Sequence, residues 1–202
     1  MDLACGDGFY TRRLKQRGAA EVIGVDISPE MIRLAKQSEH AEPLGISYQV
    51  GDAVSLPRLG SFDLVTAIYL LTYALKRGEL VGMFRSAYDN LGAGGRFIAL
   101  TDNPSFSLTK PNCTKYGVTI LSLSPAEDGY DTEAEFVADP PFRVTWHQWN
   151  EALYEMAIKE AGFRDFAWCP LEVAPEDIAR YGEAYWQDYY ENCPSIGLIC
   201  TK

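Results

Sequence analysis

The stretch that decides the fold is DLACGDGFYTRRL, Asp2–Leu14, which lies almost at the first residue of the chain. A short apolar piece leads into two glycines, Gly6 and Gly8, and a segment with helical spacing follows them. A strand that runs through a glycine turn into a helix exposes backbone N–H groups to a ligand. The stretch therefore predicts a ligand-binding loop at the end of a buried strand.

A carboxylate follows this loop at a sequence separation that is typical of nucleotide-binding units. Asp26 closes the apolar segment EVIGVD and lies 20 residues after Gly6. A carboxylate at the end of the second strand of such a unit can accept hydrogen bonds from both ribose hydroxyls. We expect a ligand that contains a nucleoside. The alternative is that Asp26 only caps a helix and that the glycine turn is structural.

The residues around the loop bear on the charge of that ligand. The third glycine of the dinucleotide pattern G-x-G-x-x-G is replaced by Thr11, and two acids, Asp2 and Asp7, border the loop. Two carboxylates disfavour a pyrophosphate at close range and favour a sulfonium or ammonium group. S-adenosylmethionine carries both of these cations in addition to adenine and ribose, so it is the cofactor that we expect.

Alternating segments up to Thr101 predict an α/β fold, a doubly wound and mostly parallel sheet with helices on both faces. The strands are expected at Met1–Ala4, Glu21–Asp26, Ile46–Val50, Phe62–Leu71 and Gly95–Thr101. Helices are expected over Tyr10–Arg17, after the cap residue Ser28, and over Gly78–Leu91, where the segment LGAGG ends the helix.

The pattern changes after Thr101. Three strand-like segments without helices predict a small antiparallel β insertion within residues 104–149, with strands at Lys115–Ser122, Glu133–Ala138 and Phe142–Trp149. An amphipathic helix should follow, capped by Asn150 and ended by Gly162. A strand in FRDFAWCP, one or two helices within Pro175–Tyr190, and a last strand in SIGLICT complete a single domain over residues 1–202.

Composition limits the classes of protein. The 202 residues carry a net charge of −10, which disfavours nucleic acid as a partner. No apolar run reaches the ~20 residues of a membrane helix and no signal peptide is visible, so we expect a cytoplasmic protein without a membrane partner. Five cysteines without a C-x-x-C pair and only two histidines predict neither a metal site nor a disulfide framework. Cys5 is interpreted as a small residue that fills the turn rather than as a nucleophile.

Several segments, in their order along the chain, resemble the motifs of the class I S-adenosylmethionine-dependent methyltransferases: DLACGDG the first motif, VIGVDIS the second, GDAVSLP the segment beside adenine, FDLVTAIYLL the fourth, and LGAGGRFIAL the turn into the fifth strand. The resemblance implies methyl transfer from S-adenosylmethionine, with S-adenosylhomocysteine as product, and a last strand that inserts antiparallel. More narrowly, the chain resembles the small-molecule branch and the N-methyltransferases of toxoflavin biosynthesis.

This resemblance also implies which residues hold the cofactor. Asp2 would lie near its amino group, Gly6 and Gly8 would allow a close approach, and Asp26 would bind the ribose. Other residues would pack against adenine, bond its amino group or line the floor of the site. The implied cofactor-binding set is Asp2, Ala4, Gly6, Gly8, Tyr10, Asp26, Ile27, Met31, Asp52, Ala53, Ile68 and Tyr69.

Methyl transfer is an in-line displacement that depends mainly on alignment and needs a base only if the acceptor must lose a proton. Tyr69 follows the fourth strand and His147 can act as a base near neutral pH, so both are candidate catalytic residues. The candidate substrate-binding residues are Tyr73, Tyr116, Trp146 and Trp149. Core packing is the competing interpretation for each of them. If aromatic side chains do line a pocket, the acceptor is a small, flat and largely apolar aromatic or heterocyclic metabolite, methylated on nitrogen or oxygen.

The first strand is only a stub, because a strand normally runs ~5–6 residues. The family usually carries an N-terminal segment over the cofactor, so we expect a shortened chain that binds S-adenosylmethionine more weakly than a form with that segment. Two other functions stay open, a nicotinamide-dependent oxidoreductase on a similar fold and a truncated, non-catalytic nucleoside-binding protein. The expected assembly is a monomer or homodimer.

Overall fold

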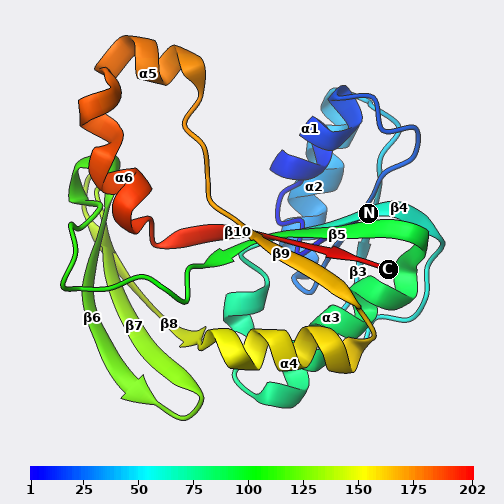
Figure 1. Cartoon of the computed structure of the whole chain (residues 1–202). Coiled ribbons are helices and arrows are strands. Elements are labelled where there is room, and N and C mark those ends of the chain that lie inside the picture. Colours follow the sequence, from blue (N-terminus) through cyan, green and yellow to red (C-terminus); the bar gives the residue numbers. More distant parts are fainter.

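A central sheet organises the chain, whose residues 1–202 are all described by a computed structural model. Its seven strands run in the order β3-β2-β1-β4-β5-β10-β9 (Figure 1). Their bounds are β1 Asp2–Leu3, β2 Ile23–Asp26, β3 Ser47–Val50, β4 Phe62–Ile68, β5 Leu91–Asp102, β9 Asp165–Cys169 and β10 Ser195–Thr201. The first five strands pair in parallel, and β10 runs antiparallel to both β5 and β9. The predicted α/β fold class with an antiparallel last strand is confirmed.

Helices cover both faces of this sheet. Figure 1 shows α1 (Phe9–Gln16) and α2 (Pro29–Ala41) on one face, and α3 (Arg77–Asn90) and α4 (Glu151–Ala161) on the other. Two helix starts follow the expected chemistry. Ser28 Oγ accepts a bond from the N–H of Met31 at 3.3 Å, and the Asn150 side chain accepts one from the N–H of Leu153 at 2.9 Å.

The main core lies between the sheet and the α3–α4 layer. Phe84 packs edge-on against Phe97 of β5, and Tyr154 and Ile158 of α4 are fully buried with them. A smaller cluster that includes Val22 and Ile32 fills the opposite face beneath α1 and α2. Replacing a core aromatic such as Phe97 with alanine would lower the free energy of unfolding by about 3–5 kcal/mol. A core packed in this way holds the strand ends in fixed positions.

The start of β5 differs from its predicted bound. β5 begins at Leu91, inside the segment LGAGG that was expected to be a turn, and its pairing with β4 shifts register between Phe62 and Leu64. The glycines are therefore accommodated by an irregular strand rather than by a loop. The C-terminal segment, predicted as one or two helices within Pro175–Tyr190, contains two. They are α5 (Pro175–Tyr181) and α6 (Gln187–Asn192), joined by a 3₁₀ turn η3 (Glu183–Trp186) because Gly182 leaves the helical conformation with φ 82°.

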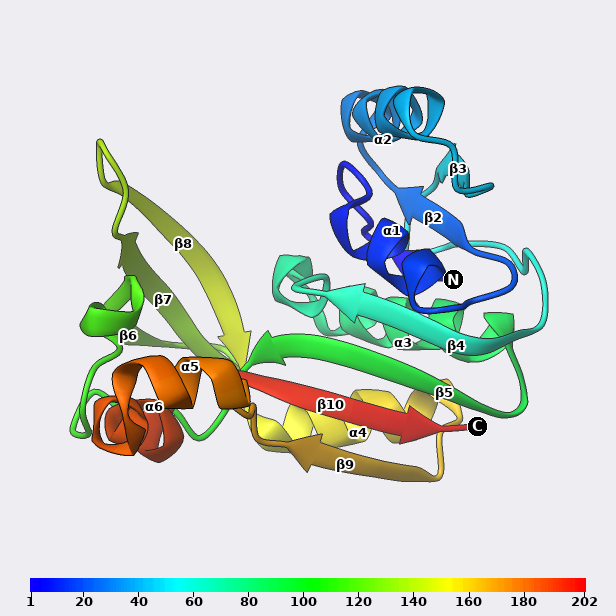
Figure 2. The same ribbon diagram turned by 90° about the horizontal axis from the view of Figure 1, so that it is seen from above.

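The insertion forms its own three-stranded antiparallel sheet, β6 (Val118–Ala126), β7 (Gly129–Phe136) and β8 (Phe142–Trp149). β8 has its predicted bounds. The predicted ends of β6 and β7 are displaced, because Ala126 pairs with Gly129 and the turn between them is tighter than the polar run suggested. Figure 2 shows this sheet beside the carboxyl end of β5, with α5 and α6 next to it.

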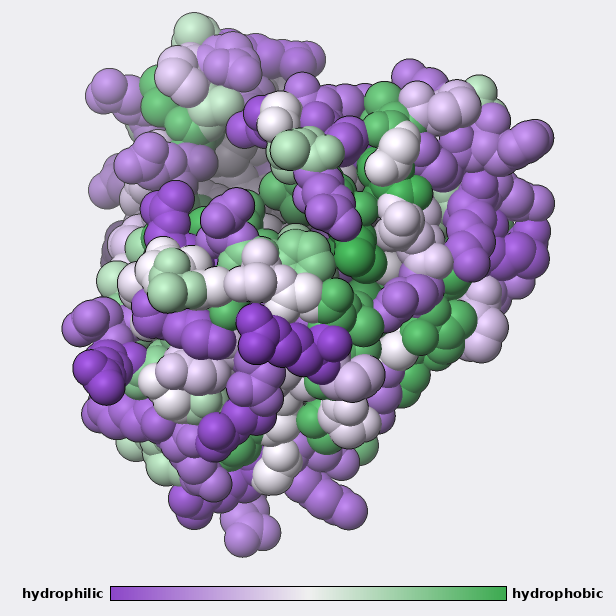
Figure 3. Space-filling model, turned by 90° about the vertical axis from the view of Figure 1, so that its right-hand side faces the viewer, coloured by the Kyte–Doolittle hydropathy of each residue, from purple (hydrophilic) through white to green (hydrophobic).

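The surface of the molecule is mostly hydrophilic. Figure 3 shows the side of the molecule that lies on the right in Figure 1. Hydrophilic residues cover most of this face, and hydrophobic residues gather near its centre and toward the right. None of the helices combines the length and the apolar character that crossing a membrane requires.

Candidate active site

The strand order marks one edge of the sheet as the candidate ligand site. Because β1 and β4 are neighbours, the chain leaves β1 toward β2 and leaves β4 toward β5 on the other side. Ligands of open α/β sheets bind outside the carboxyl ends of the strands at this switch point. Ala4, directly after β1, and Tyr69, directly after β4, have left-handed φ values of 55° and 57°. Such conformations are costly for residues other than glycine and gather at functional sites.

The glycine loop lies at this point. The N–H of Gly6 donates a 2.8 Å hydrogen bond to Oδ2 of Asp26, so the loop after β1 is joined to the end of β2. Gly6 has φ 55°, and a Cβ atom there would meet nothing within 4 Å. Gly8 has φ 91° at the start of α1, and a Cβ atom would lie 2.5 Å from the hydroxyl of Tyr48. The loop therefore leaves its backbone open on one side and is tightly packed on the other.

Asp26 is held rigidly but keeps acceptor capacity. Its Oδ1 accepts a 2.9 Å bond from the N–H of Ser28, while Oδ2 takes the bond from Gly6. An ionised carboxylate offers about four acceptor positions, of which these bonds fill two. Although only 9% exposed, the side chain is thus oriented by backbone groups to receive further donors.

Asp2 is enclosed by hydroxyl groups. Thr11 and Thr66 each donate a 2.6 Å hydrogen bond to its carboxylate, and the residue is only 1% exposed. Desolvation raises the pKa of Asp2, while the two hydroxyl donors and the chain's amino terminus oppose that shift. The carboxylate joins β1, α1 and β4, and in this arrangement its oxygens face other parts of the protein.

Cys5 has the character of a packing residue. Burial, and then the nearby Asp2 and Asp26, raise the pKa of its thiol to about 12, which disfavours the thiolate that a nucleophile requires. No group of three or more His, Cys, Asp and Glu side chains, with or without Cys5, is arranged to hold a metal ion.

The remaining residues of the predicted cofactor set follow the carboxyl ends of β1 to β4. Tyr10, Ile27 and Met31 are apolar or aromatic side chains with 44%, 66% and 39% of their surface exposed. Asp52 follows β3 and accepts a 2.8 Å bond from the N–H of Val54, with the buried Ala53 beside it. Ile68 ends β4. The structure therefore brings the predicted set to one edge of the sheet.

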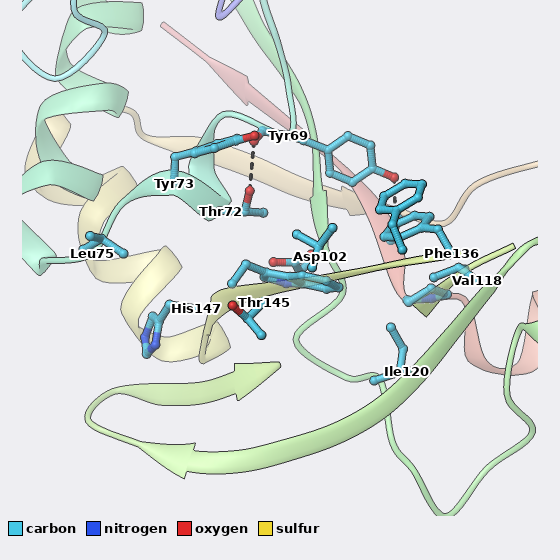
Figure 4. A pocket seen from close by; sticks show the side chains of 15 residues that line it. Tyr69, Thr72, Tyr73, Leu75, Asp102, Val118, Ile120, Phe136, Thr145 and His147 are labelled. Atoms are coloured by element: carbon cyan, nitrogen blue, oxygen red, sulfur yellow. Dashed lines mark hydrogen bonds between the residues drawn. The ribbon is translucent and has the colours of Figure 1, made fainter. Parts of the chain in front are cut away.

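A cavity of about 560 Å³ lies between this edge and the inner side of the insertion (Figure 4). Four predicted acceptor-side residues line it, Tyr69, Tyr73, Trp146 and His147. Most of the other lining side chains are apolar and come from the insertion, from the turn after β4 and from the start of β10. They include Leu75, Val118, Ile120, Phe136, Phe142 and Val144. The volume and the apolar lining are typical of a pocket for a small molecule.

Tyr69 bridges two strands at the mouth of this cavity. Its hydroxyl lies 2.9 Å from Oγ of Ser195 at the start of β10, and its carbonyl accepts a 2.9 Å bond from Thr72. Desolvation raises the pKa of Tyr69, even though 42% of the residue's surface is exposed. The phenol therefore stays protonated near neutral pH and serves as a hydrogen-bonding group rather than as a base.

His147 is oriented by a carboxylate. Nδ1 lies 3.2 Å from Oδ1 of Asp131, the residue opposite on β7, and the ring packs edge-on against Trp149 at 4.3 Å. Nε2 is buried and has no hydrogen-bond partner. An imidazole held in this way has one nitrogen fixed and the other free for a proton.

The sequence analysis missed Asp102, the last residue of β5. It lines the cavity, is 4% exposed, and has an Oδ2 atom without a hydrogen-bond partner. Burial raises the pKa of Asp102 to about 7, and the nearby indole of Trp146 opposes this shift without reaching hydrogen-bond geometry. The signal that could have found it is an acid at the end of the apolar segment FIALTD.

Two predicted substrate residues do not line the cavity. The Tyr116 hydroxyl donates to the carbonyl of Tyr185 at 2.6 Å and accepts from the N–H of Tyr189 at 3.1 Å. Its ring stacks on Trp186, with centroids 5.2 Å apart. Trp149 is 3% exposed and belongs to the main core. In these positions Tyr116 fixes the α5–α6 segment to the insertion, and Trp149 joins β8 to the central domain.

Comparison with known proteins adds a family match. The family described as a methyltransferase domain matches residues 1–95. Magnesium-protoporphyrin O-methyltransferase of Rhodobacter capsulatus is 46% identical over 74 residues, 36% of this chain and 32% of that protein. Demethylmenaquinone methyltransferase of Deinococcus radiodurans is 36% identical over 110 residues, 53% of this chain and 44% of that protein. The chain thus matches less than half the length of each of these two curated relatives.

Solved structures match over the whole chain. An S-adenosylmethionine-dependent methyltransferase from Mesorhizobium loti superposes with a TM-score of 0.67 and 20% identity. The alignment covers 100% of this chain and 89% of that protein. An amino pentose methyltransferase from Micromonospora echinaspora, solved with bound S-adenosylmethionine, superposes with a TM-score of 0.64 and 15% identity. This alignment covers 99% of this chain and 81% of that protein. At these identities the likeness concerns the fold.

Proposed function

We propose that this chain is a class I S-adenosylmethionine-dependent methyltransferase that methylates a small metabolite, a proposal supported by the methyltransferase-domain match over residues 1–95. The acceptor in this proposal is an aromatic or heterocyclic molecule, methylated on nitrogen or oxygen. One observation carries the proposal. The Gly6–Asp26 bond fixes a nucleoside-binding loop at the switch point, and an aromatic cavity opens beside it at the ends of β4 and β5.

The residues at the switch point fit the cofactor. Asp26 keeps acceptor positions for ribose hydroxyls, and the open side of Gly6 allows close approach to its backbone. Exposed apolar side chains such as Ile27 and Met31 provide a surface for adenine. We assign the cofactor to the predicted set Ala4, Gly6, Gly8, Tyr10, Asp26, Ile27, Met31, Asp52, Ala53, Ile68 and Tyr69. Asp2, also predicted, lies beneath them with its carboxylate bonded to Thr11 and Thr66. The cofactor supplies a methyl group bound to a positively charged sulfur.

The chain's own task is to position the acceptor. Alignment of two reactants at ~3–3.5 Å supplies a large part of such an acceleration. Tyr73, Trp146 and the phenylalanines of the insertion hold a flat acceptor, and the hydroxyl of Tyr69 can bond its polar edge. His147, oriented by Asp131, can take a proton from an acceptor that must lose one. In this proposal residues 104–149 form the acceptor side of a single domain.

The loop chemistry separates this function from a nicotinamide-dependent oxidoreductase. Thr11 stands where a dinucleotide-binding loop has its third glycine, and its hydroxyl is used to hold Asp2. With Asp2 and Asp7 near the loop, a pyrophosphate would meet two carboxylates. We further propose that the protein acts in the cytoplasm, as a monomer or homodimer, on a small molecule rather than on nucleic acid, which a net charge of −10 would repel.

Calorimetric titration with S-adenosylhomocysteine and with NAD tests the cofactor, and a screen of small aromatic acceptors with labelled S-adenosylmethionine tests the reaction. We expect binding of S-adenosylhomocysteine, no binding of NAD, and transfer of label to at least one acceptor. Binding of NAD instead would support the oxidoreductase. Binding of S-adenosylhomocysteine without transfer to any acceptor would support the non-catalytic nucleoside binder.

A further inference from the structure

A buried carboxylate without a partner needs an explanation, because nearly all buried polar groups are hydrogen-bonded. Asp102 is such a group, since its Oδ2 atom has no donor although the residue is only 4% exposed. It lies at the carboxyl end of β5, between β4 and β10, and it lines the 560 Å³ cavity. Figure 4 shows the Asp102 side chain among the lining residues, between Thr72 and Tyr69 on one side and Thr145 on the other.

The groups that face Asp102 do not neutralise it. No lysine or arginine lines the cavity. Tyr69, after β4, is bonded to Ser195, and Tyr154 of α4 is bonded to Thr101 at 2.9 Å. From β8 come the indole of Trp146 and the imidazole of His147.

Of these, only His147 could carry a positive charge, and its Nδ1 is directed to Asp131. When ionised, Asp102 is therefore a negative charge in the cavity without a cation of the protein as its partner.

The walls of the cavity suit a cation as well. Phe136 and Phe142 stack with centroids 5.2 Å apart, and Trp146 and Tyr69 add two further aromatic rings. Aromatic faces attract ammonium groups, and the attraction is stronger where water is excluded. A carboxylate within aromatic walls favours an amine over a neutral alcohol and disfavours an acid.

We propose that Asp102 binds the amino group of the methyl acceptor, which is a basic amine carried on an apolar body. The inference rests on the proposed function and narrows its acceptor atom to nitrogen. One proton passes from the ammonium nitrogen to a carboxylate oxygen of Asp102, which leaves a neutral amine with a free lone pair and a neutral carboxylic acid. Asp102 thus touches the reacting atom and directs it, while Trp146 and the phenylalanines hold the apolar body.

The test compares two matched probes, 2-phenylethylamine and 2-phenylethanol, titrated calorimetrically into protein saturated with S-adenosylhomocysteine. A hydrogen bond to a charged group predicts that the amine binds about tenfold more tightly than the alcohol. Asp102→Asn should remove this preference by weakening the amine about tenfold while the affinity for the alcohol stays within about twofold. Because burial raises the pKa of Asp102 to about 7, the affinity of the wild type for the amine should decrease from pH 8 to pH 6.

Asp165→Asn is the matched control, because it removes the same charge at the opposite end of the sheet, where Asp165 pairs with Thr201. It should keep the preference for the amine. Equal affinities of the wild type for the two probes, no binding of the amine, or a preference that survives Asp102→Asn would each overturn the inference. Binding of S-adenosylhomocysteine is measured separately, so its absence would refute the methyltransferase proposal rather than the role of Asp102.

Discussion

The backbone N–H of Gly6 lies 2.8 Å from Oδ2 of Asp26, and this hydrogen bond joins two segments that are 20 residues apart in the sequence. The same carboxylate accepts the N–H of Ser28 through its other oxygen, so it orients both the glycine loop and the entry into α2. A carboxylate fixed at both oxygens loses little conformational entropy when it receives a ligand hydroxyl. The pair therefore couples the shape of the loop to the position of the carboxylate that we propose for the ribose.

Replacing Asp26 with alanine should weaken the binding of S-adenosylhomocysteine at least about tenfold, the effect of losing one charge-assisted hydrogen bond. The change also leaves the N–H groups of Gly6 and Ser28 without their partner. Calorimetric titration measures the affinity directly. Glu30→Ala is the control, because it removes an equal charge whose partner is the exposed Arg33 on the same helix. An affinity of Asp26→Ala within twofold of the wild type would contradict the assignment of the ribose to Asp26.

Gly8→Ala should destabilise the protein by more than backbone strain alone. Gly8 and Gly18 have similar φ values, 91° and 98°, but only a Cβ at Gly8 would collide with Tyr48. Gly18→Ala should therefore cost about 1 kcal/mol, the usual cost of a left-handed non-glycine residue, and Gly8→Ala at least about 1 kcal/mol more. Urea unfolding gives both free energies. Equal values for the two variants would show that Tyr48 moves aside without cost.

Local signals in the sequence were sufficient to predict the doubly wound parallel sheet, whereas the antiparallel last strand was implied by the family resemblance. The helical spacing of apolar residues and the N-cap residues identify α2 and α4. The side chains of Ser28 and Asn150 accept hydrogen bonds from the N–H groups three residues further on. The alternation of strands and helices then allows few arrangements other than a doubly wound sheet. The LGAGG segment was misjudged because glycines that follow a helix suggest a turn, whereas here the pairing of β5 with β4 accommodates them.

The site was only partly predictable, because cavities are built by residues that are distant in the sequence. The residues next to Tyr116 in the sequence do not show whether it lines a pocket or packs inside the protein. Its hydrogen-bond partners, Tyr185 and Tyr189, follow about 70 residues later. Asp102 carries the same signal as Asp26, an acid at the end of an apolar strand. Without a glycine loop nearby, nothing in the sequence marks Asp102 as facing a cavity rather than solvent.

The stability of the protein should depend on pH through Asp102. Its pKa is raised from 3.8 to about 7 in the folded state, so folding favours the protonated carboxyl and is penalised by the ionised one. The penalty is complete well above pH 7 and disappears as the pH falls through 7 toward 4. Asp102→Asn should therefore raise the free energy of unfolding at pH 8 by up to about 4 kcal/mol, from 1.36 kcal/mol for each pKa unit.

Urea unfolding at pH 8 and pH 5 measures this difference, which should be less than half as large at the lower pH. Asp165→Asn serves again as the control, since Asp165 is exposed and should show no such pH-dependent gain. A destabilisation by Asp102→Asn at pH 8 would mean that the carboxylate has a stabilising partner within the protein.

Tyr116→Phe should loosen the α5–α6 segment without changing the acceptor cavity. The substitution keeps the ring that stacks on Trp186 but leaves the carbonyl of Tyr185 and the N–H of Tyr189 without the hydroxyl that serves both. An unsatisfied buried group costs about 1–3 kcal/mol, so opening of this segment should become easier and its cleavage by a protease several-fold faster. Tyr190→Phe is the control, because Tyr190 lies in α6 next to Tyr189 but is 54% exposed. The affinity for 2-phenylethylamine should remain within about twofold in both variants. A tenfold loss of that affinity in Tyr116→Phe, with unchanged proteolysis, would instead make Tyr116 a substrate contact, as its sequence context predicted.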